Sequence, residues 1–89
     1  MKVSKDFILR QIADEYMLVP IGQAAAHFNG FISMNEIGHF IFQTLEKDIT
    51  EDQIVDQILS EYDINRDTAF RDLREFLQQL RDLGALIEG

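Results

Sequence analysis

The sequence predicts an α+β fold in which a three-stranded antiparallel sheet is followed by three helices in a winged-helix-like arrangement. Three observations predict it. Apolar residues before Met34 alternate with the period of two that is typical of strands. After Asn35 they recur with the 3.6-residue period of a helix, and separate capping signals introduce two further helical segments.

The chain is long enough for one domain and too short for two. A domain of 89 residues buries roughly 60–68% of its unfolded surface, so residues 1–89 are expected to share one core. Its first residues lack the apolar stretch of a signal peptide, and no apolar run approaches the ~20 residues that span a bilayer. The expected location is therefore the cytoplasm, with no membrane partner. Cysteine is absent from the sequence, so stability must come from packing.

Two strands are expected first. The first covers residues 7–13 and places Ile8 and Ile12 on one face. A two-residue polar break, Asp14-Glu15, separates it from a second strand over residues 16–19, which ends at a proline that cannot donate to a central ladder. A hairpin is the simplest interpretation.

The next segment is ambiguous, and the third strand follows it. Residues 22–29 are predicted as a loop or a strand extension, because their three alanines favour helix whereas the turn dipeptide Asn29-Gly30 favours a hairpin. The run from Phe31 to Met34 is predicted as a strand in which Ser33 faces away from the core.

Three helices are expected after the sheet. Asn35 can cap the first, over residues 36–46. The second begins at a capping box formed by Thr50 and Gln53, the clearest helix start in the chain. The third covers residues 66–83 and ends at Gly84, which can adopt the left-handed conformation. A short apolar tail at residues 85–87 is expected to dock on the body.

Acidic residues are concentrated in the middle of the chain. Residues 35–64 hold eight acids against Lys47 alone, a sum of −7, whereas residues 1–34 sum to zero and residues 65–89 to −1. Such a surface repels a phosphate backbone, so no nucleic-acid partner is expected. The alternative, a winged-helix DNA-binding or transcription-regulatory domain, would need a basic third helix.

Patterns that indicate catalysis or metal binding are missing from the sequence. His27 and His39 fall on separate elements, without an acid at metal-ligand spacing. Ser33 lacks the flanking glycines of a nucleophile elbow. An acyl-carrier-like domain would need an Asp-Ser-Leu attachment site, which the sequence also lacks. We therefore expect a protein that is not an enzyme, with no cofactor and no metal.

The third strand is a candidate binding edge. If it is the last strand of the sheet, its outer N–H and C=O groups could pair with an extended peptide. Six or so ladder bonds, each worth a net ~0.5–1.5 kcal/mol, would give useful affinity. Two alternatives stay open: the tail at residues 85–87 covers this edge, or the edge pairs with a second copy to form a homodimer.

The third helix carries a second candidate surface. Phe70, Arg74, Leu77 and Arg81 recur at helical spacing beside the main apolar stripe. A ligand there could bury apolar groups against the phenylalanine and leucine while its acids meet the arginines. Equally, the two apolar residues could widen the core while the arginines pair with Glu75, Asp82 or the acidic second helix.

Several segments taken together resemble the PqqD-like family. The resemblance covers nearly the whole chain and rests on the order and spacing of Phe7-Ile8-Leu9-Arg10, Glu15-Tyr16-Met17-Leu18-Val19-Pro20, Asn29-Gly30-Phe31-Ile32-Ser33-Met34-Asn35-Glu36-Ile37-Gly38, Glu61-Tyr62-Asp63 and Leu80-Arg81-Asp82-Leu83-Gly84-Ala85-Leu86.

The resemblance implies the fold of a recognition element for ribosomally made, post-translationally modified peptides (RiPPs). Such a protein binds the leader segment of a precursor peptide as an added strand, in a cleft walled by the third helix. It presents the peptide to a modifying enzyme, which in the quinone-cofactor (PQQ) pathway is a radical S-adenosylmethionine (radical SAM) protein. Carried over by position, the peptide-binding residues would be Phe31, Ile32, Ser33 and Met34. Phe70, Arg74, Leu77 and Arg81 would face them, a choice that comes from helical spacing.

Overall fold

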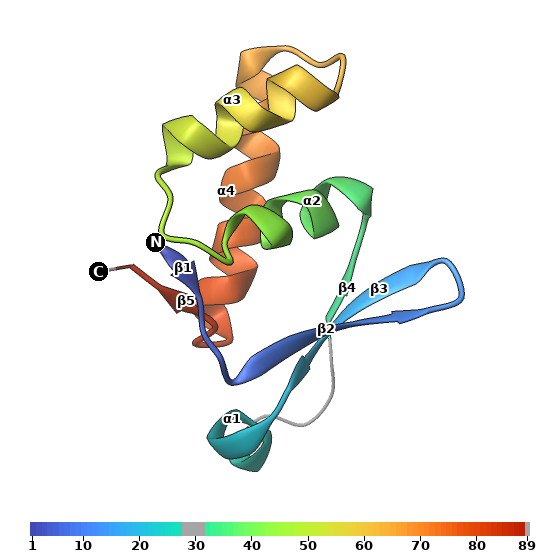
Figure 1. Cartoon of the computed structure of the whole chain (residues 1–89), viewed down its shortest axis with the longest axis vertical. Helices are drawn as coiled ribbons and strands as arrows, with labels where there is room; N and C mark the ends of the chain where they lie inside the picture. The colour runs from blue at the N-terminus through green and yellow to red at the C-terminus, as the bar shows by residue number, and fades with distance from the viewer. Residues whose placement is uncertain (28–31, 89) are drawn as a thin grey trace.

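The computed structural model describes residues 1–27 and 32–88, and it shows a twisted sheet beside a helical body, as Figure 1 illustrates. The β2–β3 hairpin extends away from the helices, and both termini lie beside the lower part of the last helix. The predicted α+β class, with a three-stranded antiparallel sheet, is confirmed.

The sheet has the strand order β2-β3-β4. Strand β2 (Phe7–Ile12) pairs with β3 (Glu15–Pro20), which pairs with β4 (Ile32–Met34), and both pairings are antiparallel. The two-residue turn is Ala13-Asp14, one residue earlier than the predicted break, and Ala13 has a φ of 56°. Among the described residues, β4 therefore lies at one edge of the sheet, which is the condition on which the sequence made it a candidate binding edge.

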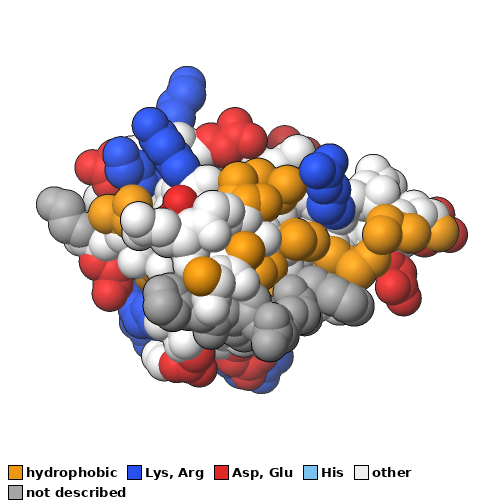
Figure 2. All heavy atoms as spheres, turned by 90° about the horizontal axis from the view of Figure 1, so that it is seen from below, with side chains coloured by type: hydrophobic (Ala, Val, Ile, Leu, Met, Phe, Trp, Pro, Cys, Tyr) orange, Lys and Arg blue, Asp and Glu red, His pale blue; other side chains and the backbone are white. Residues whose placement is uncertain are grey.

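The register gives the sheet one face toward the helices and one away from them. Leu9 lies opposite Leu18, which lies opposite Ile32, and all three contact the main core. Ile8 and Ile12 lie on the other face, where Ile12 is 62% exposed. Seen from below, hydrophobic side chains run along this side of the molecule toward the hairpin (Figure 2).

The segment after β3 differs from its prediction. Residues Gly22–His27 form the short helix α1, so the expectation of a loop or a strand extension was wrong there. The helix propensity of the three alanines decides the local structure. Gly22 enters the helix with a φ of +57°, and the preceding Ile21 N–H donates to the carbonyl of Asp6 at 2.7 Å. The Asn29-Gly30 turn lies outside the described residues.

Three longer helices form the body. They are α2 (Glu36–Thr44), α3 (Glu51–Glu61) and α4 (Arg66–Asp82). Each begins at a side-chain cap, with Asn35 Oδ1 accepting from the Gly38 N–H at 2.8 Å and Asn65 Oδ1 accepting from the Thr68 N–H at 2.8 Å. The helix starts are thus where the sequence places them.

The capping box of α3 is fully formed. The Gln53 N–H donates to Thr50 Oγ1 at 3.2 Å, and the Thr50 N–H donates to Gln53 Oε1 at 3.1 Å. At the end of α4, Gly84 has a φ of +71° and stops the helix.

A second, two-stranded sheet joins the two ends of the described chain. Strand β1 (Lys2–Val3) pairs antiparallel with β5 (Leu86–Ile87), and the Ser4 N–H donates to the Ala85 carbonyl at 2.7 Å. The apolar tail therefore docks on the body, as expected. It does not cover β4, so the alternative in which the tail closes that edge was wrong.

One hydrophobic core connects the sheet to the helices. Its buried members come from β2, β3, β4, all three long helices and the segments that follow α2 and α4: Phe7, Leu18, Met34, Ile41, Phe42, Leu45, Ile54, Val55, Ile58, Ala69, Leu73, Phe76, Leu77, Leu80 and Ala85. Within the described ranges, every helix is too short or too polar to cross a bilayer.

Candidate functional site

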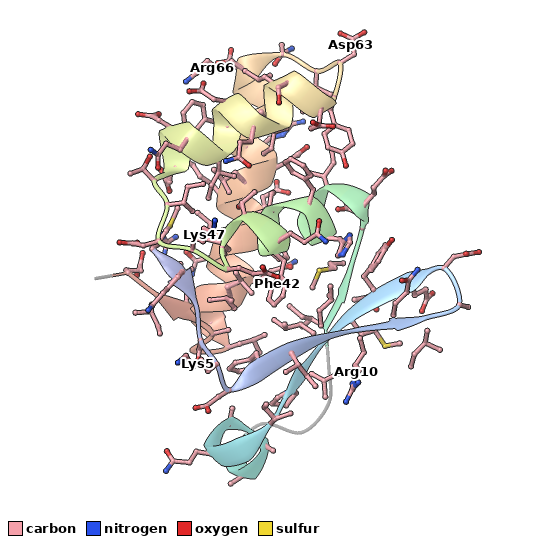
Figure 3. All side chains as sticks on the ribbon, viewed as in Figure 1. Lys5, Arg10, Phe42, Lys47, Asp63 and Arg66 are labelled. Carbon is pink, nitrogen blue, oxygen red and sulfur yellow. The ribbon has the colours of Figure 1, made fainter. Side chains whose placement is uncertain are left out.

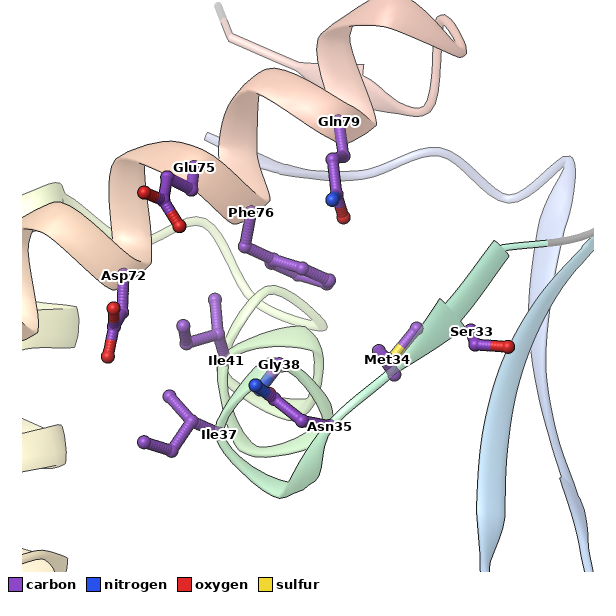
Figure 4. A pocket seen from close by; sticks show the side chains of 10 residues that line it. All are labelled: Ser33, Met34, Asn35, Ile37, Gly38, Ile41, Asp72, Glu75, Phe76 and Gln79. Atoms are coloured by element: carbon purple, nitrogen blue, oxygen red, sulfur yellow. The ribbon is translucent and has the colours of Figure 1, made fainter.

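A groove lies where β4, α2 and α4 meet. Ser33 and Met34 line it from the strand, while Asp72, Glu75, Phe76 and Gln79 line it from α4 (Figure 4). The first turns of α2 form the base, with Asn35, Ile37, Gly38 and Ile41.

Gly38 lies between the other two elements of the groove, β4 and α4. A Cβ atom built on Gly38 would lie 3.1 Å from Met34 Cβ and 3.4 Å from Phe76 Cδ1. A side chain at this position would crowd Met34, which would have to move by a few tenths of an ångström. The absence of this one methyl group lets β4 and α4 flank the start of α2.

The groove has a volume of about 160 Å³. Sites that enclose a small molecule have roughly 300–1,000 Å³, so this one suits a single side chain rather than a whole metabolite. A single side chain is what an extended chain lying along β4 would direct into it.

The outer edge of β4 has no neighbouring strand among the described residues. The three residues Ile32, Ser33 and Met34 form this edge, and their exposures alternate as predicted, with Ser33 exposed and Met34 buried. Phe31, the fourth predicted strand residue of the site, lies outside the described residues. A strand of three residues can form roughly two to four backbone hydrogen bonds with a peptide along its outer edge. This is fewer than the six or so expected from the sequence.

The structure places the predicted stripe of α4 away from this groove. Leu77 has no exposed surface and packs in the core, while Phe70 is half-buried. Arg74 is exposed and lies over the Phe70 ring at 5.2 Å, and Arg81 binds Glu88 at 2.7 Å. Leu77 therefore widens the core, as the alternative expected. Its arginine partners differ, because Arg81 pairs with Glu88 and not with Glu75, Asp82 or the second helix.

The residues of α4 that line the groove lie on the opposite flank of the apolar stripe. Residues 72, 75, 76 and 79 share one side of the helix, and at about 100° per residue residues 74 and 81 fall roughly opposite to it. Their i, i+3, i+4 and i+7 spacing was visible in the sequence. Sequence alone does not say which flank of a buried stripe faces the sheet.

The groove is acidic on its helical wall. Its ten lining residues include Asp72 and Glu75 and contain no lysine, arginine or histidine. The Asp72 side chain is 32% exposed, and the ion pair recorded for it joins its Oδ1 to Arg71 Nε at a long 3.9 Å. This wall can therefore accept hydrogen bonds from a cation.

Two groups near the C-terminal end of α4 have shifted pKa values, and both lie outside the groove. The Arg81 guanidinium hydrogen-bonds Glu88 and lowers the pKa of that carboxyl, while Glu88 raises the pKa of Arg81. This pair ties the end of α4 to the segment after β5, and so it has a structural role.

His39, the residue after Gly38, packs against the sheet. Its ring stacks on Tyr16 of β3, with centroids 3.9 Å apart and planes within 9°. Among the described residues, no group of three or more His, Cys, Asp or Glu side chains is arranged to hold a metal ion. The contact instead holds α2 against the sheet.

A larger hollow of about 690 Å³ follows the opposite edge of the sheet. Phe7 and Leu9 of β2 line it together with Lys5, Phe42 and Ile87. Figure 3 labels Lys5 near the start of β2 and Phe42 on α2. Its lining mixes acids and bases, so it shows no net preference for the charge of a ligand.

Comparisons with known proteins agree with this fold. The family model described as coenzyme PQQ synthesis protein D (PqqD) matches residues 15–86. The solved structure described as "TbiB1 in Complex with the TbiA(beta) Leader Peptide" is similar, with 30% identity and a TM-score of 0.77, covering 100% of this chain and 98% of that one. No curated protein matches.

Proposed function

This chain belongs to the PqqD family, and on that premise we propose that it is a non-catalytic peptide-binding protein. It captures the leader segment of a ribosomally made precursor peptide by strand addition and presents that peptide to a modifying enzyme. The similar TbiB1 structure, a complex with a leader peptide, supports this function.

The open outer edge of β4 beside a groove is the observation that carries the proposal. An extended leader would pair with Ile32, Ser33 and Met34 through backbone hydrogen bonds, and alternate side chains would enter the groove. No group that reacts with a peptide is required for this function.

Backbone pairing alone is too weak for a useful complex. Two to four ladder bonds contribute about 1–6 kcal/mol, whereas a micromolar dissociation constant requires about 8 kcal/mol. The remainder, together with the cost of ordering the leader, must come from side chains in the groove. The residues that line it from α2 and α4 therefore decide which leader binds.

Presentation to an enzyme needs no chemistry from this chain. Holding the leader near an active site raises the effective concentration of the segment to be modified. We propose that the enzyme is a radical SAM protein and that the encounter takes place in the cytoplasm, where precursor peptides are made.

Amide chemical-shift mapping tests the proposal. The ¹⁵N-labelled protein is titrated with synthetic leader segments of short peptides encoded beside its gene. The expected shifts fall on residues 32–34 and on the groove side of α4, at residues 72–79. Binding that shifts only residues 7–9 and 42–46 would assign the peptide to the β2 edge instead, and failure of every candidate leader to bind would contradict the function.

A further inference from the structure

We propose that the groove beside β4 selects a leader that carries a lysine or arginine side chain, which Asp72 and Glu75 bind. The inference rests on the proposed function, because the strand edge aligns the peptide and the acids only choose among peptides. It names a property of the ligand that the fold by itself does not specify.

The position of the two acids supports this selection. Asp72 and Glu75 occupy successive turns of α4 on the wall of the groove, near the apolar side chains of Phe76, Ile41 and Ile37 (Figure 4). A lysine or arginine has an aliphatic stem and a charged head, so its stem can lie on the apolar surface while its head reaches the carboxylates. The groove offers both parts of that environment side by side.

Both acids are available to a ligand. Asp72 is paired only at 3.9 Å with Arg71, whose own side chain is 68% exposed, and an exposed pair at that distance is weak. Glu75 is exposed and takes part in none of the ion pairs recorded for the described residues. A basic side chain of the leader would therefore have to displace only the weak contact between Arg71 and Asp72.

The start of α2, which lies at the base of the groove, favours an anion. A helix N-terminus carries the equivalent of about half a positive charge, and here Asn35 already accepts from the Gly38 N–H. Two full negative charges on α4 outweigh that half charge, and Glu36 in the first turn of α2 reduces it further. The net preference of the groove is for a cation.

This preference reverses the sign that the sequence suggested. The predicted stripe offered Arg74 and Arg81 to an acidic leader, but both point away from the groove, and Arg81 is occupied by Glu88. A leader seated against β4 meets carboxylates instead.

Selection from a displayed library of random 14-residue peptides tests the inference. Three proteins are used: the natural chain, a groove variant with Asp72→Lys and Glu75→Lys, and a control with Glu61→Lys and Asp63→Lys. The control makes the same change in net charge at the far end of α3, where Figure 3 labels Asp63. Shift mapping of selected peptides reports whether they bind along β4.

The natural chain and the control are expected to enrich lysine or arginine at one fixed peptide position, and the groove variant is expected to lose that preference. Replacing the basic residue of a selected peptide by alanine should weaken binding to the natural chain about five- to tenfold. If all three proteins select the same residue at that position and the peptides still bind along β4, the preference for a basic residue would be overturned and the proposed function would stand. Selected peptides that bind away from β4 would overturn the proposed function as well.

Discussion

The backbone of Gly38 in α2 lies directly against the side chain of Met34 in β4. A Cβ at position 38 would approach the Met34 Cβ to 3.1 Å, closer than side chains normally pack. Because the Met34 Cβ is fixed to the strand, no rotation of a side chain can relieve the contact. The spacing of β4 and α2, and with it the base of the groove, depends on this glycine.

Gly38→Ala is therefore expected to destabilise the protein and to weaken leader binding. Alanine gains roughly 0.5–1 kcal/mol of helix propensity, but overpacking costs about 1–3 kcal/mol, so a net loss of about 1 kcal/mol is expected in urea unfolding. Gly84→Ala is the matched control, since its added Cβ would meet nothing within 4 Å but would be strained at a φ of +71°. The Gly84→Ala variant should lose stability but keep its affinity for the leader. If Gly38→Ala binds the leader as tightly as Gly84→Ala does, this role of Gly38 would be contradicted.

Leu77 is expected to act through the core. Leu77→Ala removes a fully buried side chain and should lower the free energy of unfolding by about 2–5 kcal/mol. Arg74→Ala, at an exposed position one turn earlier, should lower it far less. Denaturant titration of both variants measures the difference, and a loss below about 1 kcal/mol for Leu77→Ala would be inconsistent with its burial.

The exposed arginines of α4 are expected to be dispensable for a leader that occupies the groove. Arg74→Glu combined with Arg81→Glu changes the side of the helix opposite to residues 72, 75 and 79. Calorimetric titration with a β4-bound peptide should give an affinity within about twofold of the natural chain. A large loss would show that the leader reaches around α4 to the predicted stripe.

The ion pair between Arg81 and Glu88 predicts a pH dependence. The hydrogen bond from Arg81 lowers the pKa of Glu88 in the folded state, below its ordinary value of 4.5. The resulting stabilisation is present above the unfolded pKa and is lost as the pH falls through the folded pKa. Carbon-detected NMR titration should show the Glu88 midpoint rising in Arg81→Ala and staying low in Arg74→Ala. An unchanged midpoint in Arg81→Ala would assign the shift to another cause.

The sequence determined those parts of the fold that depend on neighbouring residues. Asn35, the Thr50–Gln53 capping box and Gly84 mark helix boundaries through contacts within a few residues, and all of them are formed. The alternation that places Met34 inward and Ser33 outward is equally local. The short helix α1 was missed because two local signals competed, and the alanines prevailed.

Only the tertiary structure decided which surfaces meet. The sequence predicted that α4 and the edge strand form the two sides of a binding site. It could not show that Asp72 and Glu75, rather than Arg74 and Arg81, face β4, nor that the tail pairs with β1 and leaves the edge open. The apolar stripe of a helix fixes which side is buried and leaves two equivalent flanks. Which flank borders the sheet depends on contacts between residues far apart in the chain, such as the approach of Phe76 to Gly38.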